Sequence, residues 1–279
     1  MPRRSRLLPA AGLLISLAGA PLLQVRAHAQ GPYIWTFDHK TGETERFRTY
    51  IKITGKTADS SGDIVLSLKS SSKHEYKDVS ADGTAVFEQS DESREIVFNG
   101  MPIAFKPAET RPVTLTVCKN GIYIKRANPN VDLGTAYREK SLLAITSLPA
   151  PETPVRVGES WTTVMPNPML KNKMITVTST LASVERVLGV NALKINLKME
   201  FPYTIDPSDN EVVKVDETYY LDATTHQLLQ ARSTIKNPVM PFPVGKVQAD
   251  SFVTRVVAGV NEKADPDENK LIEAVPTGK

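Results

Sequence analysis

The feature that most constrains the fold of this chain is a two-residue alternation of apolar and polar side chains, which recurs along most of its 279 residues. In the segment 46–53, Phe47, Ile51 and Ile53 alternate with Arg46, Arg48, Tyr50 and Lys52, and similar spacing recurs at 63–69, 95–98 and 113–117. A period of two places successive side chains on opposite faces of a strand. The pattern predicts antiparallel strands with one covered face and one mostly solvated face.

Short turn signals separate the predicted strands. Asn120-Gly121 tolerates the positive φ angles of a tight turn, so it predicts a hairpin between 113–118 and 122–125. Further strands are expected at 174–186, 192–201, 212–221, 228–235 and 252–257, with turns at 189–191 and 222–227. One short helix is expected within 135–148, where apolar residues are irregularly spaced and neither proline nor glycine follows residue 135 until Pro149.

These patterns predict an all-β, mainly antiparallel fold: a curved open sheet or half-barrel with at most one or two short helices. Three prolines make 149–154 an extended connector, because proline lacks an amide donor. It separates an N-terminal β-rich half, 30–148, from a C-terminal β-rich half, 155–258. The pattern allows either one continuous sheet or two β halves. Residues 259–279 are charged and are expected to form a flexible tail.

The first 29 residues have the features of a cleavable secretory signal. Three arginines lie within the first six residues, a largely apolar run follows, and Ala27-His28-Ala29 supplies the small residues that signal peptidase requires. Cleavage is expected between Ala29 and Gln30, and the mature protein is expected in the periplasm or outside the cell. The uninterrupted apolar segments are shorter than the ~20 residues of a membrane span. No lipid anchor is expected, because the single cysteine, Cys118, lies far downstream.

Cleavage would change the charge of the chain. The full sequence has 34 Lys and Arg against 31 Asp and Glu, and the first 29 residues carry four arginines and no acid, which leaves 30 basic residues against 31 acidic ones. With a net charge near zero and no basic run, no nucleic-acid partner is expected. Cys118 has no second cysteine to pair with, and its apolar context predicts a packed, unreactive strand residue.

The sequence contains no recognisable catalytic, metal-binding or cofactor motif, so the protein is predicted not to be an enzyme and to need no cofactor. His39, His74 and His226 have no second ligand type at metal-site spacing, and surface or turn positions are expected for them. The acidic stretch 265–268 lacks the glycine and the terminal glutamate of an EF-hand loop.

Two proline-rich loops carry apolar side chains where polar turn residues are usual. The first contains Met165, Met169 and Leu170, and the second contains Met240 and Phe242. Two interpretations are open. The loops could fold back over the ends of the core, or they could form an apolar rim around a ligand or partner site, because methionine adapts to varied hydrophobic partners.

Two segments together resemble a known group of proteins. The stretch 148–161 ends in Gly158-Glu-Ser-Trp161, and 219–229 reads as an aromatic strand, an aspartate, a polar turn and a returning strand. This arrangement resembles uncharacterised bacterial exported proteins with a Gly-X-Ser-Trp element, which are similar to the curved half-barrels of LolA-type periplasmic lipoprotein carriers. The resemblance covers 148–235 and implies a half-barrel. It implies no carrier activity, because the basic residue at the opening of those carriers has no identifiable counterpart in this chain.

The residues of this element are expected to have structural roles. Gly158 permits a backbone turn that other residues resist, and Trp161 can bury a large ring at the start of a strand. Ser160 does not fit a nucleophile elbow, because Thr162 replaces its second glycine and no helical pattern follows.

The sequence therefore favours a non-catalytic exported protein that binds a lipid or another hydrophobic ligand on a curved β-sheet. The alternative is a structural or assembly module of the cell envelope that binds another protein through an edge strand or its apolar loops. A cavity filled by large side chains would favour the second hypothesis.

Overall fold

The computed structural model of this protein describes residues 31–56, 62–104, 110–131, 139–202, 212–238, 247–258 and 260–262. It divides into the units Met1–Gly31 and Pro32–Lys279, and every element described below belongs to the second unit. The expected cleavage site at Ala29 and Gln30, the two loop residues Met240 and Phe242, and residues 263–279 lie outside the described residues.

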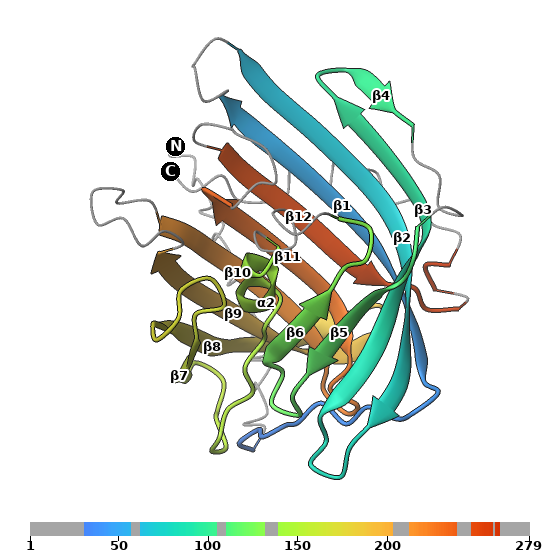
Figure 1. Ribbon diagram of the computed structural model, residues 1–279. Helices are drawn as coiled ribbons and strands as arrows, with labels where there is room; N and C mark the ends of the chain where they lie inside the picture. The colour runs from blue at the N-terminus through green and yellow to red at the C-terminus, as the bar shows by residue number, and fades with distance from the viewer. Residues whose placement is uncertain are drawn as a thin grey trace, which may run out of the picture. The chain divides into compact units, whose positions relative to one another are not determined.

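The described chain forms one open, curved antiparallel sheet, as the alternation predicts (Figure 1). Its 12 strands follow the order β6-β5-β3-β2-β1-β12-β11-β10-β9-β8-β7, and β4 pairs with β3. The bounds are β1 Thr44–Lys56, β2 Asp63–Val79, β3 Ala85–Phe98, β4 Met101–Ile103, β5 Val113–Val117, β6 Tyr123–Ala127, β7 Ser160–Pro166, β8 Met174–Val187, β9 Val190–Pro202, β10 Val212–Asp222, β11 Leu228–Lys236 and β12 Val247–Arg255.

The pairing of β1 with β12 joins the strands that precede the proline-rich connector to those that follow it. Phe47 lies opposite Arg255, and Ile53 lies opposite Ala249. Strands from both sides of the connector therefore belong to one continuous sheet rather than to two. Because this pairing joins segments from opposite ends of the sequence, no local pattern specifies its register.

Local turn chemistry closes most of the neighbouring strand pairs. Gly121 has a φ of +83° between β5 and β6, which confirms the hairpin expected there. Leu188 and Gly189 both have positive φ between β8 and β9, and such angles match the twist of a two-residue hairpin. The Asp222 carboxylate accepts hydrogen bonds from the backbone N–H groups of Thr224 and Thr225 in the turn before β11.

Helix α2, Ser141–Ile145, lies on the concave side of the sheet (Figure 1). It lies within 135–148, where one short helix was expected. After it, the backbone N–H of Leu148 donates to the Gly121 carbonyl, and that of Ala150 donates to the Asn120 carbonyl. These bonds hold the chain after α2 against the β5–β6 turn. In the part of the chain that the structure describes, no helix has the length and apolar character needed to cross a membrane.

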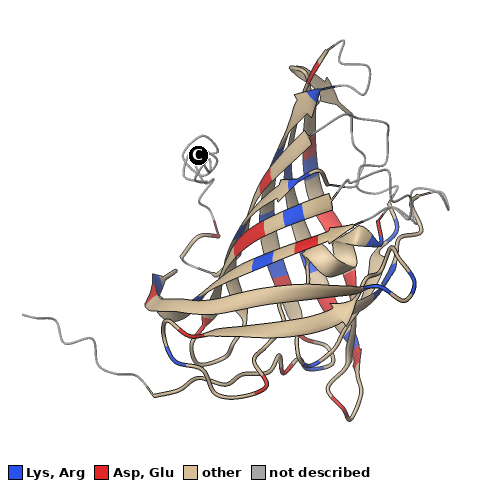
Figure 2. Ribbon diagram, turned by 90° about the vertical axis from the view of Figure 1, so that its left-hand side faces the viewer, with Lys and Arg blue, Asp and Glu red and all other residues tan. Residues whose placement is uncertain are grey.

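The two faces of the sheet differ in chemistry. The largest buried cluster lies on the concave face and includes Leu193, Ile195 and Leu197 of β9, each fully buried. Acidic and basic residues are interspersed along the strands (Figure 2). Between β9 and β10 they pair across strands, as Lys198 does with Asp216, with 3.3 Å between nitrogen and oxygen. This division follows from the period-two pattern.

Two side chains lie elsewhere than the sequence suggests. Cys118 is a half-buried residue of the β5–β6 turn rather than a packed strand residue, because β5 ends at Val117. Tyr50 lies on the mostly polar face of β1, yet it is only 1% exposed. Both differences arise from tertiary packing that a strand pattern does not report.

Candidate functional site

A cavity of about 640 Å³ lies against the concave face of the sheet. Strands β1, β2, β10, β11 and β12 form its floor, and α2 and the segment around Phe37 form part of its cover. A volume of this size lies within the range of about 300–1,000 Å³ that is typical of small-molecule sites. The strand alternation creates the cavity wall, because every second side chain on each strand points into it.

One row of inward-facing side chains across the sheet is apolar. Val215, Ile235, Ala249 and Ile53 lie opposite one another in register on β10, β11, β12 and β1. All four are buried, and the last three line the cavity. This row gives the cavity a hydrocarbon surface.

The neighbouring row of inward-facing side chains is polar on β10, β11 and β12 and apolar on β1. Glu217, Ser233 and Ser251 lie opposite one another, followed by Ile51. The Ser233 and Ser251 hydroxyl oxygens are 2.6 Å apart, and the Tyr219 hydroxyl donates to the Glu217 carboxyl over 2.6 Å. A further hydrogen bond links Ser233 with Glu217. We call Glu217, Tyr219, Ser233 and Ser251 the polar row; its members form one hydrogen-bonded chain on the cavity floor.

The pKa of the Glu217 carboxyl is far above its ordinary value. Its side chain is 7% exposed, and burial raises its pKa to about 8, although the hydrogen bonds from Tyr219 and Ser233 oppose this shift. Removal from water disfavours the charged form. Glu217 is therefore mostly protonated at neutral pH.

Replacing Glu217 with glutamine is expected to flatten the pH dependence of stability. Between the ordinary pKa of 4.5 and the folded value of about 8, the folded protein keeps a proton that the unfolded chain releases. The free energy of unfolding of the parent should therefore fall as the pH rises through this window, by an amount on the order of a few kcal/mol. Urea unfolding at pH 5 and pH 8.5 measures it, with the exposed Glu200→Gln as control. Equal pH dependence in Glu217→Gln and the parent would contradict the assignment.

A second group of polar side chains lines the cavity near the start of β1. The Tyr76 hydroxyl donates to Glu45 over 3.0 Å, and the His39 ring stacks on Tyr76 with ring centres 4.1 Å apart. His74 lies in the cavity wall between the rings of Phe47 and Phe87, and burial lowers its pKa to about 4. His74 is thus an uncharged cavity residue on β2, not the surface or turn residue that was expected, whereas His226 does lie in the β10–β11 turn.

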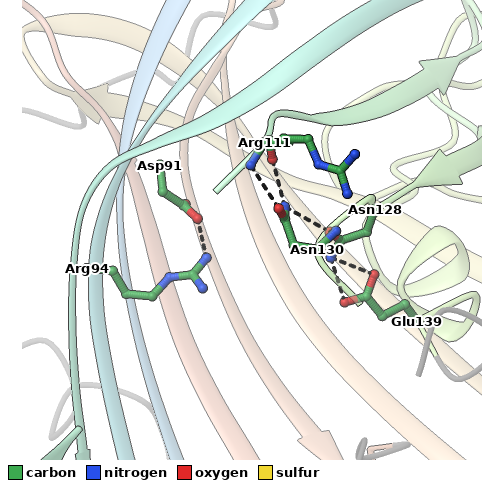
Figure 3. A network of polar contacts seen from close by, with 6 residues as sticks. All are labelled: Asp91, Arg94, Arg111, Asn128, Asn130 and Glu139. Carbon is green, nitrogen blue, oxygen red and sulfur yellow. Dashed lines mark hydrogen bonds and ion pairs between the residues drawn. The ribbon is translucent and has the colours of Figure 1, made fainter. Parts of the chain in front are cut away.

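A polar network ties α2 to the β5–β6 hairpin (Figure 3). Glu139, two residues before α2, accepts hydrogen bonds from the Asn128 amide over 3.0 and 3.1 Å and from Arg126 over 3.2 Å. Asn130 bonds both the backbone N–H and the carbonyl of Arg111. The network positions α2, which supplies part of the cavity wall, relative to the hairpin.

The predicted apolar rim is wrong for Met165, which belongs to β7, and for Met169 and Leu170 in the loop that follows it. Met165, Met169 and Leu170 are 2%, 6% and 5% exposed, and none of them lines the cavity. The Asn167 side chain accepts hydrogen bonds from the backbone N–H groups of Met169 and Leu170 and so folds the loop back into the core. The core-capping interpretation holds there. The other two rim residues, Met240 and Phe242, lie outside the described residues.

The Gly-X-Ser-Trp element lies outside the cavity wall. Gly158 has a φ of +90°, and the Trp161 ring packs edge-on against Trp35 with ring centres 5.5 Å apart. The Trp161 indole N–H also donates to the Pro149 carbonyl over 3.1 Å. The exposed Ser160 hydroxyl hydrogen-bonds with Thr180. These contacts give the element a structural role.

Sequence reasoning missed the polar row and Glu45. The sequence does contain a signal for one member. Glu217 has the same strand phase as the apolar residues Val213, Val215 and Leu221, so its charge interrupts the buried face of β10. A charged side chain in that phase indicates either a paired core residue or a site.

Comparisons with known proteins leave the family open. No protein-family model and no curated protein matches this chain. Among solved structures, lipovitellin, in a study of its lipid–protein interactions, has a TM-score of 0.47 and 9% identity over 79% of this chain and 25% of that one. The chain thus spans about a quarter of the length of the lipovitellin chain.

Two bacterial structures also match over 80% of this chain and 98% of their own chains. One is described as an exported protein with a YmcC-like fold from Bacteroides fragilis, with a TM-score of 0.29 and 11% identity. The other is described as a lipoprotein from Parabacteroides distasonis, with a TM-score of 0.29 and 9% identity. None of these three structures is described as a LolA-type carrier, so that resemblance remains a prediction.

Proposed function

We propose that this protein is a non-catalytic exported protein that binds a lipid or a similar amphiphile in the cavity on the concave face of its sheet. The observation that carries the proposal is the cavity of about 640 Å³, whose wall contains apolar side chains such as Ile53, Ile235 and Ala249. Protein interiors are normally filled to crystal-like density, and apolar voids are destabilising. An apolar space of this size is best explained by an occupant.

The absence of a catalytic role is part of the proposal. The titratable pairs in the cavity, Tyr219 with Glu217 and Tyr76 with Glu45, are hydrogen-bonded to each other, and burial raises the pKa of both tyrosines. Tyrosine hydroxyls whose pKa is raised still further above neutral pH are poorly suited to proton transfer there. Export rests on the N-terminal arginines, the apolar run and the site at Ala29. Finding Gln30 as the first residue of protein purified from its native host would support export, and an intact Met1 would contradict it.

Filling the cavity should weaken ligand binding. Ala231 lines the cavity on β11, whereas Gln230, its neighbour in the strand, points to the opposite face. The parent should enhance the fluorescence of the apolar probe N-phenyl-1-naphthylamine. We expect Ala231→Trp to weaken probe binding at least about ten-fold, which corresponds to about 1.4 kcal/mol, because the new ring occupies the space of the ligand.

The matched control is Gln230→Trp, which adds the same ring outside the cavity and should bind the probe like the parent. Circular dichroism would confirm that both variants are folded. A parent that binds no probe, or an Ala231→Trp variant that binds as well as the control, would contradict ligand binding in this cavity.

The alternative, an envelope module that binds another protein, is supported by the edges of the sheet. Strands β6 and β7 each have one neighbour among the described strands, and Val164 of β7 is 56% exposed. Unpaired strand edges can accept a partner strand. The unfilled cavity favours the ligand-binding proposal over this one. A parent that binds no amphiphile but crosslinks to one specific envelope protein would reverse that preference.

A further inference from the structure

We propose that the cavity selects its ligand by the charge of the head group, taking an uncharged, hydrogen-bonding head such as an alcohol or a glycerol ester at the polar row and disfavouring carboxylates, phosphates and ammonium groups. This inference rests on the proposed ligand-binding function and names the class of ligand. Three observations point to it: the described lining contains no lysine or arginine, the polar row offers hydrogen bonds, and the polar row adjoins an apolar row.

The described lining of the cavity offers no lysine or arginine to an anionic head group. Two arginines reach acidic residues of the lining, and each is ion-paired there: Arg255 with Glu45, and Arg126 with Glu139. Burial lowers the pKa of each of the three lining histidines, His39, His74 and His226, so these rings are mostly neutral at pH 7. An anionic head group would therefore be buried without a counter-charge, which is strongly unfavourable.

Outside the lining residues, Arg94 of β3 pairs with Asp91 on the same strand (Figure 3). Its charge is therefore also balanced by a carboxylate. Of the four acidic residues in the described lining of the cavity, Glu217 is mostly protonated at neutral pH, and Glu45 and Glu139 are ion-paired with arginines. The fourth, Asp38, adds a negative charge that repels an incoming carboxylate.

The polar row supplies the groups that a neutral head requires. Ser233, Ser251 and Tyr219 each carry a hydroxyl, which can donate one hydrogen bond and accept others. The Glu217 carboxyl is mostly protonated at neutral pH, so it meets a hydroxyl or ester as a neutral partner. An ammonium head at the polar row would meet a charged carboxylate there only after Glu217 had lost that proton. A neutral head incurs neither cost.

The order of the rows matches an amphiphile. Three members of the polar row, Glu217, Ser233 and Ser251, each lie two positions along the strand from a member of the apolar row, which consists of Val215, Ile235, Ala249 and Ile53. A ligand whose head lies at Ser233 and Ser251 can therefore place its hydrocarbon chain directly on apolar surface. The contact area supplies affinity and the polar row supplies discrimination.

Three competitors with the same chain length test the proposal. N-phenyl-1-naphthylamine bound to the whole mature protein at pH 7 is displaced with dodecanol, dodecanoate or dodecylamine below their aggregation limits. Dodecanol should displace the probe at a concentration at least about ten-fold lower than either charged competitor. Dodecanoate or dodecylamine competing as well as dodecanol would overturn the proposal. Failure of the probe to bind at all would instead contradict the proposed function.

Two variants at one position locate the head group. Glu217→Gln keeps a neutral hydrogen-bonding side chain and should retain the preference for dodecanol within about three-fold, whereas Glu217→Leu should lose most of it while still binding the probe. Ser251→Ala, a milder change in the same row, should also reduce the preference and serves if Glu217→Leu does not fold. An unchanged preference in the folded variants that remove a polar group would overturn the assignment of the head-group site.

Discussion

Gly121→Ala should lower the free energy of unfolding by more than about 3 kcal/mol, among the largest effects expected for one added methyl group. Gly121 has a φ of +83°, which L-residues resist. A Cβ at this position would lie 2.2 Å from the Leu148 carbonyl oxygen and 2.5 Å from the Phe37 ring. The first of these contacts is with backbone that cannot rotate away, so the β5–β6 turn or the segment after α2 must move.

Gly158→Ala provides the matched control. Gly158 also has a positive φ, +90°, but an added Cβ would have no atom within 4 Å. The free energy of unfolding of Gly158→Ala should therefore fall only by what the unfavourable backbone conformation costs, about 1–2 kcal/mol. Urea unfolding of the two variants and the parent, followed by circular dichroism, separates the clash from the backbone strain. Equal decreases in the free energy of unfolding of the two variants would show that the structure relieves the clash at Gly121 at little cost. The clash would then not explain the effect of Gly121→Ala.

The effect at Gly121 should extend to ligand binding. The Gly121 carbonyl accepts the backbone N–H of Leu148, and the Lys119 carbonyl accepts that of Phe37. Both Leu148 and Phe37 line the cavity. The β5–β6 turn therefore links the local fold to the position of the cavity wall.

Trp161→Ala should have the second large effect and lower the free energy of unfolding by about 3 kcal/mol. The Trp161 ring packs against Trp35, which is 2% exposed, and its indole N–H satisfies the Pro149 carbonyl. Truncation removes the ring contact and leaves a backbone acceptor without its partner. Thermal and urea unfolding of the mature chain would measure the loss.

Two neighbouring changes define what Trp161 contributes. Trp161→Phe keeps a ring but not the N–H donor, so its free energy of unfolding should fall by less, about 1–2 kcal/mol. Ser160→Ala removes an exposed hydroxyl and should stay within about 0.5 kcal/mol of the parent. A Trp161→Ala variant that unfolds like the parent would show that the ring is not a core anchor.

Local chemistry in the sequence was enough to predict several elements. Asn120-Gly121 specified a hairpin because glycine accepts positive φ at low cost, and alternation specified which side chains of β1 and β10 share a face. One short helix was predicted within 135–148, and α2, Ser141–Ile145, lies there, although the sequence pattern did not specify its ends. The predicted apolar rim is wrong at Met169 and Leu170, because hydrogen bonds from their backbone N–H groups to Asn167 fold that loop inward.

The sequence by itself determined most strand segments, several turns and which side chains of a strand share a face, since these depend on neighbours one to four residues apart. It did not predict that 70–79 of β2 and 85–94 of β3 are strand. Only the tertiary structure decided that β1 pairs with β12, and that Glu217, Ser233 and Ser251 lie in one row beside an apolar row. The cavity requires that register together with α2, which the β5–β6 turn holds. Register between strands far apart in the chain depends on packing across the whole sheet, and a slip by one residue would turn the polar row away from the cavity.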